Sequence, residues 1–384
     1  MSGSLLFDEE LMSKHPDPPS PARRSFITTT SGAIAGAVAA SRISVPSAAA
    51  QDMPATSAGA RRKIPIGIFD PAFPDLTLDQ LVEKYSSLGA EAAEIGTGGY
   101  PDNKHCPLPE LLTDSGKLKA WKKKFDDHNI LIGALSCHGN PVHPNKKIAE
   151  RDAETFRNTV LLAEKIGVKV IVGFSGCPGG NPTDTNPNWV TYRWPPEYNA
   201  ALEWQWKEKV VPYWKQAAKF ARDHGIHKLA FEMHPNFVVY NPLTLLKLRE
   251  AVGEEIGANC DLSHLFWQGC NPVEVIHFLG KQGAIFHAHM KDTVLYPDNL
   301  AKYGVLNFVF EKQDLKKASD AFRAVGYGHS ATLWKDVIRA YMDVGYDGIL
   351  SVENEDPILS GEVGVERALW VLKNVREELL TEQV

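Results

Sequence analysis

The sequence predicts a (β/α)8 TIM barrel, an α/β fold in which eight parallel strands alternate with helices. Eight short apolar segments are each followed by a segment with helical spacing of apolar residues, and no strand is left over. Four of these segments end in acidic or imidazole side chains, as strands do when their carboxyl ends form a site. The 384 residues, 43% of them hydrophobic, also exceed the about 250 that one such barrel needs.

The expected strands are recognised by their apolar content and their polar or glycine-rich ends. In chain order they cover 63–70, 92–97, 131–139, 168–176, 228–235, 256–264, 284–292 and 348–355. The stretch from Ile285 to Asp292, IFHAHMKD, is the most informative, because it places two imidazoles, an ammonium and a carboxylate at the end of a buried strand. Such a concentration of polar groups is costly unless the end of the strand is a site.

The expected helices have capping residues at their starts and glycines near their ends. They cover 76–89, 117–128, 147–167, 201–224, 241–252, 271–280, 332–345 and 363–380. Thr77 or Asp75 is available to cap the first helix, and Gly89 to end it. Two long excursions, 177–199 and 293–330, interrupt the alternation. Trp189 and Trp194 in the first excursion either stack on a sugar ring or pack beneath their own loop.

The first 50 residues resemble an export signal of the twin-arginine type. Arg23 and Arg24 precede Phe26 and a mildly apolar stretch, and an alanine-rich segment up to Ala50 suits a cleavage site. This predicts a signal peptide at 1–50, a linker at 51–62 and a barrel domain at 63–384, in an exported, periplasmic protein. The apolar stretch is short and rich in Gly, Ala and Thr, so no stable membrane span is expected. A tail with a chance arginine pair is the alternative.

The charge narrows the class of partner, and the cysteine positions bear on possible disulfides. The formal net charge is −6 and no basic block occurs, so the sequence lacks the electrostatic footprint of a nucleic-acid-binding protein. A small-molecule carbohydrate is the expected partner, and a homo-oligomer is left open. Cys137 and Cys260 sit in apolar strand patterns, whereas Cys106, Cys177 and Cys270 lie in or beside loops, where a disulfide between two of them is left open.

Four side chains fall at equivalent ends of expected strands: Glu232, Asp261, His289 and Glu353. The first three are spaced by 29 and 28 residues, about one βα unit per step. Three carboxylates with one imidazole and no thiolate suit one divalent metal ion, Mn²⁺ first, with Mg²⁺, Co²⁺ or Zn²⁺ as alternatives. The competing interpretation pairs each acid with a nearby lysine or arginine. Without a cation, however, three clustered carboxylates would repel one another.

Other polar side chains near the strand ends are candidates for binding substrate: His138, His264, His234, Lys291 and Glu94. Strand parity places Lys291 on the same face as His289, and places His287 one layer below His289. The alternatives are hydrogen-bonded rim histidines and, for Lys291, a salt bridge to a neighbouring acid.

The motifs FEMHP, CDLSH, HAHMKD and SVENED, with SCHGNP on the third expected strand and GYDG before the eighth, resemble the sugar phosphate isomerase/epimerase family, the xylose isomerase-like TIM barrels. The resemblance covers about Lys63 to Leu380. It implies that one divalent metal is held by Glu232, Asp261, His289 and Glu353. It further implies, from the ketose 3-epimerases of this family, that the two glutamates are the acid/base pair and that His264 touches the substrate.

Two positions depart from those ketose 3-epimerases. They carry an Arg six residues after the metal His and a Glu six residues after the first metal Glu, and here Leu295 and Val238 stand at these positions. The endonuclease IV branch shares the four ligands but adds an Asp-x-His pair, which KDTVLYPDN lacks. The motifs therefore leave the substrate open.

These observations predict a metal-dependent sugar isomerase or epimerase that moves a proton next to the carbonyl of a keto-sugar or related polyol. Glu232 is assigned as the base on one face of the substrate and Glu353 as the acid on the other. A lyase or dehydratase acting on an inosose or a 3-keto-glycoside is the first alternative. An exported, non-catalytic sugar-binding protein is the alternative of another class, and the two carboxylates argue against it because binding alone needs no pair of them.

Overall fold

The structure is a computed structural model that describes residues 62–306 and 314–382. All of these residues belong to one compact unit, Ala58–Val384. The predicted signal at 1–50 and all but the last residue of the predicted linker at 51–62 lie outside the described residues, so both stay predictions. In the described part of the chain, no helix has the length and apolar character needed to cross a membrane.

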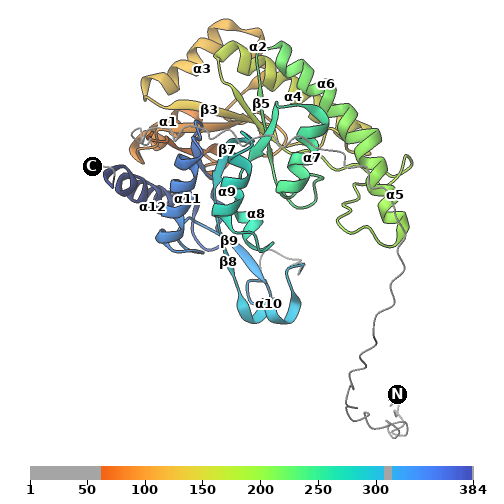
Figure 1. Cartoon of the computed structure of the whole chain (residues 1–384). Coiled ribbons are helices and arrows are strands. Elements are labelled where there is room, and N and C mark those ends of the chain that lie inside the picture. Colours follow the sequence, from red (N-terminus) through yellow and green to blue (C-terminus); the bar gives the residue numbers. More distant parts are fainter. Residues whose placement is uncertain (1–61, 307–313, 383–384) are drawn as a thin grey trace, which may run out of the picture. The chain divides into compact units, whose positions relative to one another are not determined.

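Eight parallel strands close into a barrel surrounded by helices (Figure 1). The order around the ring is β1-β10-β7-β6-β5-β4-β3-β2. Barrel strands that are consecutive in the sequence are therefore neighbours, and the last of them, β10, pairs with the first, β1. This confirms the predicted (β/α)8 fold. The strands are β1 Ile66–Phe69, β2 Ala92–Gly96, β3 Leu131–Ser136, β4 Val170–Gly173, β5 Lys228–Glu232, β6 Ile256–Asn259, β7 Ile285–Met290 and β10 Leu350–Val352.

Most outer helices begin and end near the residues that the sequence marks. In α1, Leu78–Ser87, Thr77 and Gln80 form a capping box. After α4, Lys146–Ile166, Gly167 takes a left-handed φ of 81° and ends the helix. The sequence did not predict the short helices α2 and α8. The remaining helices of this set are α2 Leu108–Thr113, α3 Ser115–Asp127, α7 Pro242–Val252, α8 Ser263–Phe266, α9 Pro272–Gly280, α11 Ala331–Asp343 and α12 Gly361–Thr381.

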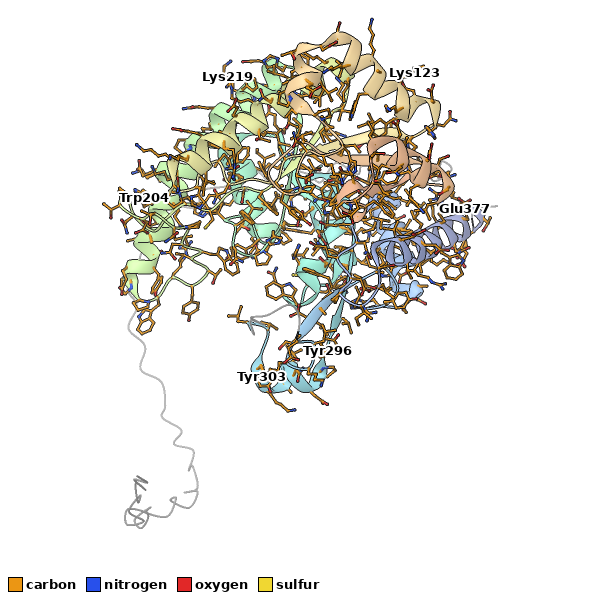
Figure 2. All side chains as sticks on the ribbon, turned by 180° about the vertical axis from the view of Figure 1, so that it is seen from behind. Lys123, Trp204, Lys219, Tyr296, Tyr303 and Glu377 are labelled. Carbon is orange, nitrogen blue, oxygen red and sulfur yellow. The ribbon has the colours of Figure 1, made fainter. Side chains whose placement is uncertain are left out.

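The predicted helix at 201–224 is longer and less regular than expected. It consists of α5 Pro196–Trp204, a π-helical turn Gln205–Val210 and α6 Val211–Asp223. Pro212 accounts for the irregular turn, because it has no N–H to donate and its ring would meet the carbonyl four residues earlier. Figure 2 shows Trp204 and Lys219 along this helical segment.

The predicted strand at 284–292 ends early. β7 stops at Met290, and β8, Asp292–Leu295, pairs antiparallel with β9, Asp320–Arg323, in a separate two-stranded sheet. With α10, Pro297–Tyr303, this sheet occupies the excursion for which the sequence predicted no element. The Asp292 carboxylate fixes the return of the excursion, because it accepts hydrogen bonds from the backbone N–H groups of Gly326, Gly328 and His329 and from the indole of Trp334.

Apolar side chains fill two regions. A large cluster lies between the strands and the helices. A smaller one consists of Ala134, Val170, Val172, Ala230 and Phe286. Because alternate residues of a strand share a face, Ala230 points to the same side as Glu232. The smaller cluster therefore forms an apolar floor inside the barrel, beneath the carboxyl ends of the strands.

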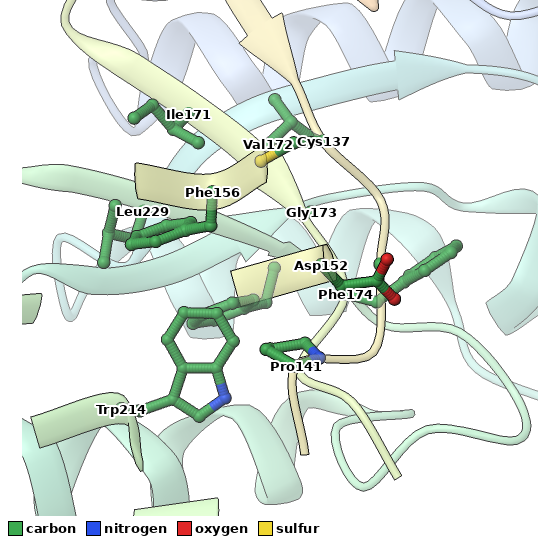
Figure 3. Close-up of a pocket in the computed structure, with 12 residues that line it drawn as sticks. Cys137, Pro141, Asp152, Phe156, Ile171, Val172, Gly173, Phe174, Trp214 and Leu229 are labelled. Carbon is green, nitrogen blue, oxygen red and sulfur yellow. The ribbon is translucent and has the colours of Figure 1, made fainter. Parts of the chain in front are cut away.

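A very small cavity lies between the outer helices and the strands (Figure 3). Phe156 of α4, Trp214 of α6 and Leu229 of β5 line it, and its volume is about 10 Å³. A space of this size holds at most one water molecule, so it is a packing feature and not a substrate site.

All five cysteines are free thiols. No disulfide joins any two of Cys106, Cys177 and Cys270. Burial raises the pKa of Cys177 to about 12, so this thiol stays protonated and unreactive at neutral pH.

Candidate metal centre

Four side chains that are far apart in the sequence meet at the carboxyl end of the barrel. Glu232 ends β5, Asp261 follows β6, His289 lies in β7 and Glu353 comes directly after β10. One possible ligand atom from each lies within 4.8 Å of the others. His289 Nδ1 is 3.0 Å from Glu353 Oε2, 3.5 Å from Glu232 Oε2 and 3.8 Å from Asp261 Oδ2. The structure thus brings together the four residues that the sequence nominated.

This geometry fits a divalent cation. Donor atoms that each lie at about 2.0–2.4 Å from an ion are themselves roughly 3–4.5 Å apart, as these are. Asp261 Oδ2 and His289 Nδ1 are buried and have no hydrogen-bond partner, although the Lys291 ammonium lies 3.1 Å from Asp261 Oδ2. Such buried polar atoms are unfavourable unless a further group meets them. None of the four residues is more than 5% exposed, so three buried carboxylates repel one another, and a divalent ion would offset this repulsion in addition to the Lys291 ammonium.

Glu94 lies beneath this point, at the opposite side of the His289 ring. Both Glu94 oxygens lie 3.1 Å from His289 Nε2, and Glu94 Oε2 is 2.7 Å from His287 Nε2. Ser136 donates a further hydrogen bond to Glu94. With Nε2 directed at Glu94, a neutral His289 ring would present the lone pair of Nδ1 to Glu232, Asp261 and Glu353. The predicted substrate contact, Glu94, is therefore placed one layer below the site, with its oxygens already engaged.

Three histidines surround Glu232. His264 Nε2 lies 3.1 Å from Glu232 Oε1, and His138 Nε2 lies 3.2 Å from Glu232 Oε2. The ring of His234 packs edge-on against that of His264, with 4.2 Å between centroids. Burial and the charge of His264 lower the pKa of His234 to about 4, so this ring is neutral at neutral pH. All three predicted histidines thus lie at the site, and His264 is on α8 rather than on a strand.

Lys291 is the one ammonium among the described residues at the centre. Its Nζ lies 2.7 Å from Glu353 Oε2, 3.1 Å from Asp261 Oδ2 and 2.9 Å from Glu355 Oε2. Burial lowers the pKa of Lys291, but these carboxylates outweigh burial and hold the pKa well above its ordinary value. Lys291 is therefore charged. The sequence left open whether Lys291 reaches the site or forms a salt bridge with a neighbouring acid, and in the structure it does both.

The sequence did not nominate two further residues at the centre, Glu355 and Asn259. Glu355 accepts hydrogen bonds from Lys291 and from the Tyr100 hydroxyl, which joins the loop after β2 to the loop after β10. Asn259, at the end of β6, donates from Nδ2 to Glu232 Oε2 at 3.3 Å. Strand parity carries a signal for both, because Glu355 lies two residues after Glu353 and Asn259 two residues before Asp261.

The arrangement can present two carboxylates to one small molecule from different sides. In the barrel, β6 and β7 lie between β5, which carries Glu232, and β10, which precedes Glu353. A group bound near His289 would therefore meet one carboxylate on each flank, in a buried setting that strengthens electrostatic interactions.

Comparisons with known proteins agree with this description. A family model described as Xylose isomerase-like TIM barrel matches residues 82–375. The Uncharacterized protein YfiH of Bacillus subtilis (strain 168) is 36% identical over 300 residues, which cover 78% of this chain and 95% of that protein.

Solved structures show the same fold at low identity. A D-tagatose 3-epimerase-like protein is 19% identical, with a TM-score of 0.55, over 82% of this chain and 99% of that one. The IOLI protein, in a crystal structure described as having a binding zinc atom, is 20% identical, with a TM-score of 0.55, over 83% of this chain and 99% of that one. The family match and the closed parallel barrel confirm the resemblance seen in the motifs: the chain belongs to the xylose isomerase-like TIM barrel family.

Proposed function

We propose that this protein is a divalent-metal-dependent isomerase or epimerase that moves a proton next to the carbonyl of a keto-sugar or related polyol. The observation that carries the proposal is the meeting of Glu232, Asp261, His289 and Glu353 around one buried point. The family and the names of the similar structures, an epimerase-like protein and a zinc-containing one, support it. Mn²⁺ is the proposed ion, because three carboxylates and one imidazole form a hard ligand set.

A divalent cation held by these four side chains would supply Lewis-acid polarisation of the substrate carbonyl. Glu232 is the proposed base. Burial raises its pKa, but hydrogen bonds from His138 and His264 lower it, and on balance the pKa lies well below its ordinary value. Glu232 is therefore ionised at neutral pH, as a base that takes a proton from carbon must be.

Glu353 is the proposed acid on the other flank. Its Oε2 accepts a hydrogen bond from Lys291 at 2.7 Å, which fixes the carboxyl group beside His289. If Glu353 delivers its own proton to the face opposite the one from which Glu232 removed a proton, the configuration at that carbon inverts, and Glu232 is left protonated and Glu353 ionised. If the proton goes to the neighbouring carbon, the sugar isomerises.

The histidines are the proposed contacts to substrate hydroxyls. His234 is neutral, and its Nδ1 donates to the Pro235 carbonyl, so its Nε2 can accept a hydrogen bond from a substrate hydroxyl. His138 and His264 each have one nitrogen directed at Glu232 and so lie where a substrate next to that base would be. Lys291 is proposed to contact a substrate oxygen from the Glu353 side.

A lyase or dehydratase on an inosose or 3-keto-glycoside is the second candidate. The specific observation in its favour is that Val238 and Leu295 stand where ketose 3-epimerases carry Glu and Arg, and Val238 is only 4% exposed. The site therefore lacks two groups with which those enzymes could grip a free ketose. Loss of a β-substituent after proton removal by Glu232 would give elimination in place of inversion.

The test is deuterium exchange. Mn²⁺-loaded protein is incubated in D₂O with a panel of keto-sugars, inososes and 3-keto-glycosides, and deuterium at the carbon next to the carbonyl is measured by NMR and mass spectrometry. We expect exchange with at least one compound, and its loss in Glu232→Gln, which removes the proposed base, whereas the exposed control Glu366→Gln keeps it. Release of water or of an alcohol identifies the lyase. Saturable sugar binding without exchange across the panel would contradict the proposal and favour a sugar-binding protein.

A further inference from the structure

A second cavity has one lining residue, Val238, in common with the positions discussed for substrate binding. Its volume is about 270 Å³, close to the lower end of the range for small-molecule pockets, about 300 Å³. It is lined by the loop after β4, the π-helical turn and the start of α7, and we call it the Trp189 cavity after one of the residues that line it: Trp189, Arg193, Gln205, Trp206, Tyr240 and Lys247. None of the four candidate metal ligands or of the three histidines around Glu232 lines it.

Two buried polar atoms of the residues that line this cavity have no hydrogen-bond partner. Gln205 is fully buried, and its Nε2 donates to the Gly179 carbonyl at 3.0 Å and to the Asn188 carbonyl. These two carbonyls fix the orientation of the amide and leave Gln205 Oε1 as an unused acceptor. The Trp189 Nε1–H is an unused donor. Leaving such groups unpaired is unfavourable, so a ligand that meets both is favoured.

The charged side chains that line the cavity are positive. Arg193 and Lys247 line it, and no carboxylate is among the described residues that do. Lys247 Nζ lies 3.8 Å from the centroid of the Trp206 ring. Burial and the charge of Arg193 lower the pKa of Lys247, and Glu203 opposes this shift only in part. Two cations on one cavity favour an anionic occupant.

The Trp189 side chain provides a flat apolar surface. The Trp189 ring meets Tyr240 edge-on at 5.4 Å between centroids, so it is held in one orientation. Indole faces stack on the apolar faces of sugar rings, and hydroxyl groups satisfy single donors and acceptors around the ring.

We propose that the Trp189 cavity binds a carboxylate-bearing sugar at a site separate from the metal centre. The sugar carboxylate lies between Arg193 and Lys247, a hydroxyl donates to Gln205 Oε1, and a ring or hydroxyl oxygen accepts from Trp189 Nε1. This inference does not rest on the proposed function, because the cavity shares no lining residue with the four ligands and binds whether or not the metal centre turns over a substrate.

The experiment compares D-glucuronate with D-glucose, which has the same ring without the carboxylate. Full-length protein is treated with EDTA to empty the metal centre, and binding is followed by calorimetry and tryptophan fluorescence. We expect saturable binding of D-glucuronate that weakens at high salt, and at least tenfold weaker binding of D-glucose. Binding is expected to be the same after Mn²⁺ is restored.

Two variants locate the binding. Lys247→Met removes one cation, and Trp189→Phe keeps an aromatic ring but removes the N–H donor. Each is expected to weaken D-glucuronate binding by about tenfold without lowering the melting temperature by more than a few degrees, whereas the exposed control Lys281→Met leaves binding unchanged. The proposal is overturned if neither variant weakens binding, if D-glucuronate does not bind, or if binding requires Mn²⁺ and disappears in Glu232→Gln.

Discussion

At the scale of single residues, Glu94 orients the imidazole of the candidate metal centre. It is fully buried, and its carboxylate engages His287 Nε2 and His289 Nε2. A carboxylate behind a ligating histidine fixes the tautomer and makes the ligand more basic. We therefore propose a positioning role for Glu94 in place of the substrate contact that the sequence suggested.

Glu94→Gln is expected to weaken Mn²⁺ binding by about 10- to 100-fold, because the amide holds no negative charge behind His289. Calorimetric titration of the metal-free protein measures the affinity. The exposed control Glu366→Gln should bind Mn²⁺ as the wild type does. An unchanged affinity in Glu94→Gln, with an unchanged melting temperature, would contradict the positioning role of Glu94.

Substitution of Lys291 is expected to change the Mn²⁺ affinity in the opposite direction. Its ammonium lies 3.1 Å from Asp261 Oδ2 and 2.7 Å from Glu353 Oε2, and so competes with a cation for these oxygens. Lys291→Met should therefore strengthen Mn²⁺ binding, by roughly tenfold, while turnover falls. Affinity and turnover are measured on the same preparation, with the exposed Lys302→Met as control. A weaker Mn²⁺ affinity in Lys291→Met would show that the ammonium supports the ligands instead of competing with them.

The sequence could nominate the four candidate ligands because each stands at the end of an apolar strand pattern. It could not tell which way Glu94 points along the barrel axis, because parity gives the face of a strand but not its layer relative to neighbouring strands. Nor could it decide between the two interpretations of Lys291. Glu355, which the sequence analysis passed over, accepts a hydrogen bond from that ammonium across 64 residues of sequence.

At the scale of elements, an ion pair ties the last helix to the first two strands. Arg376 of α12 is 2% exposed, donates to the Ile64 carbonyl at 2.8 Å and binds Glu91, which also accepts from the backbone N–H of Ile66. Burial raises the pKa of Glu91, but hydrogen bonds from Arg376, Lys63 and Ile66 outweigh burial and lower the pKa to about 2. These contacts hold α12 against the strands where the barrel closes.

The depressed pKa predicts how stability depends on pH. Because the pKa of Glu91 is lower in the folded protein than its unfolded value of about 4.3, its contribution is fully present above that value and is lost as the pH falls toward 2. Glu91→Gln should lower the free energy of unfolding by about 1–2 kcal/mol at pH 6, since the carboxylate is partly exposed. The difference from wild type should shrink at pH 3. Urea unfolding at both pH values measures it, and a difference that grows at pH 3 would contradict the assignment.

Local patterns predicted the elements well, except where a contact between residues distant in the sequence determines where an element ends. The break after β7 depends on Asp292, whose partners lie at 326–334, beyond a long excursion. No local pattern could show that pairing. The π-helical turn, in contrast, follows from Pro212, a signal that is visible in the sequence once the helix is known to run through it.

At the scale of the whole molecule, the barrel and its family are established, and export stays a proposal. We propose that residues 1–50 direct export by the twin-arginine route. In a bacterial host with that route, the protein is expected in the periplasm with its new N-terminus near residue 51, and the double variant Arg23→Lys, Arg24→Lys is expected to stay in the cytoplasm at full length. Cell fractionation and mass spectrometry test this. Export of the double variant would contradict it.

The central claim is that four distant side chains hold one divalent ion at the mouth of the barrel. Metal analysis after Mn²⁺ loading and dialysis tests it most directly, in wild type, in Asp261→Asn and in the exposed control Asp298→Asn. We predict about one Mn²⁺ per chain in the wild type and the control, and a loss of at least tenfold in affinity in Asp261→Asn. A wild-type chain that retains no divalent metal, or an Asp261→Asn chain that binds as tightly as the wild type, would contradict the account.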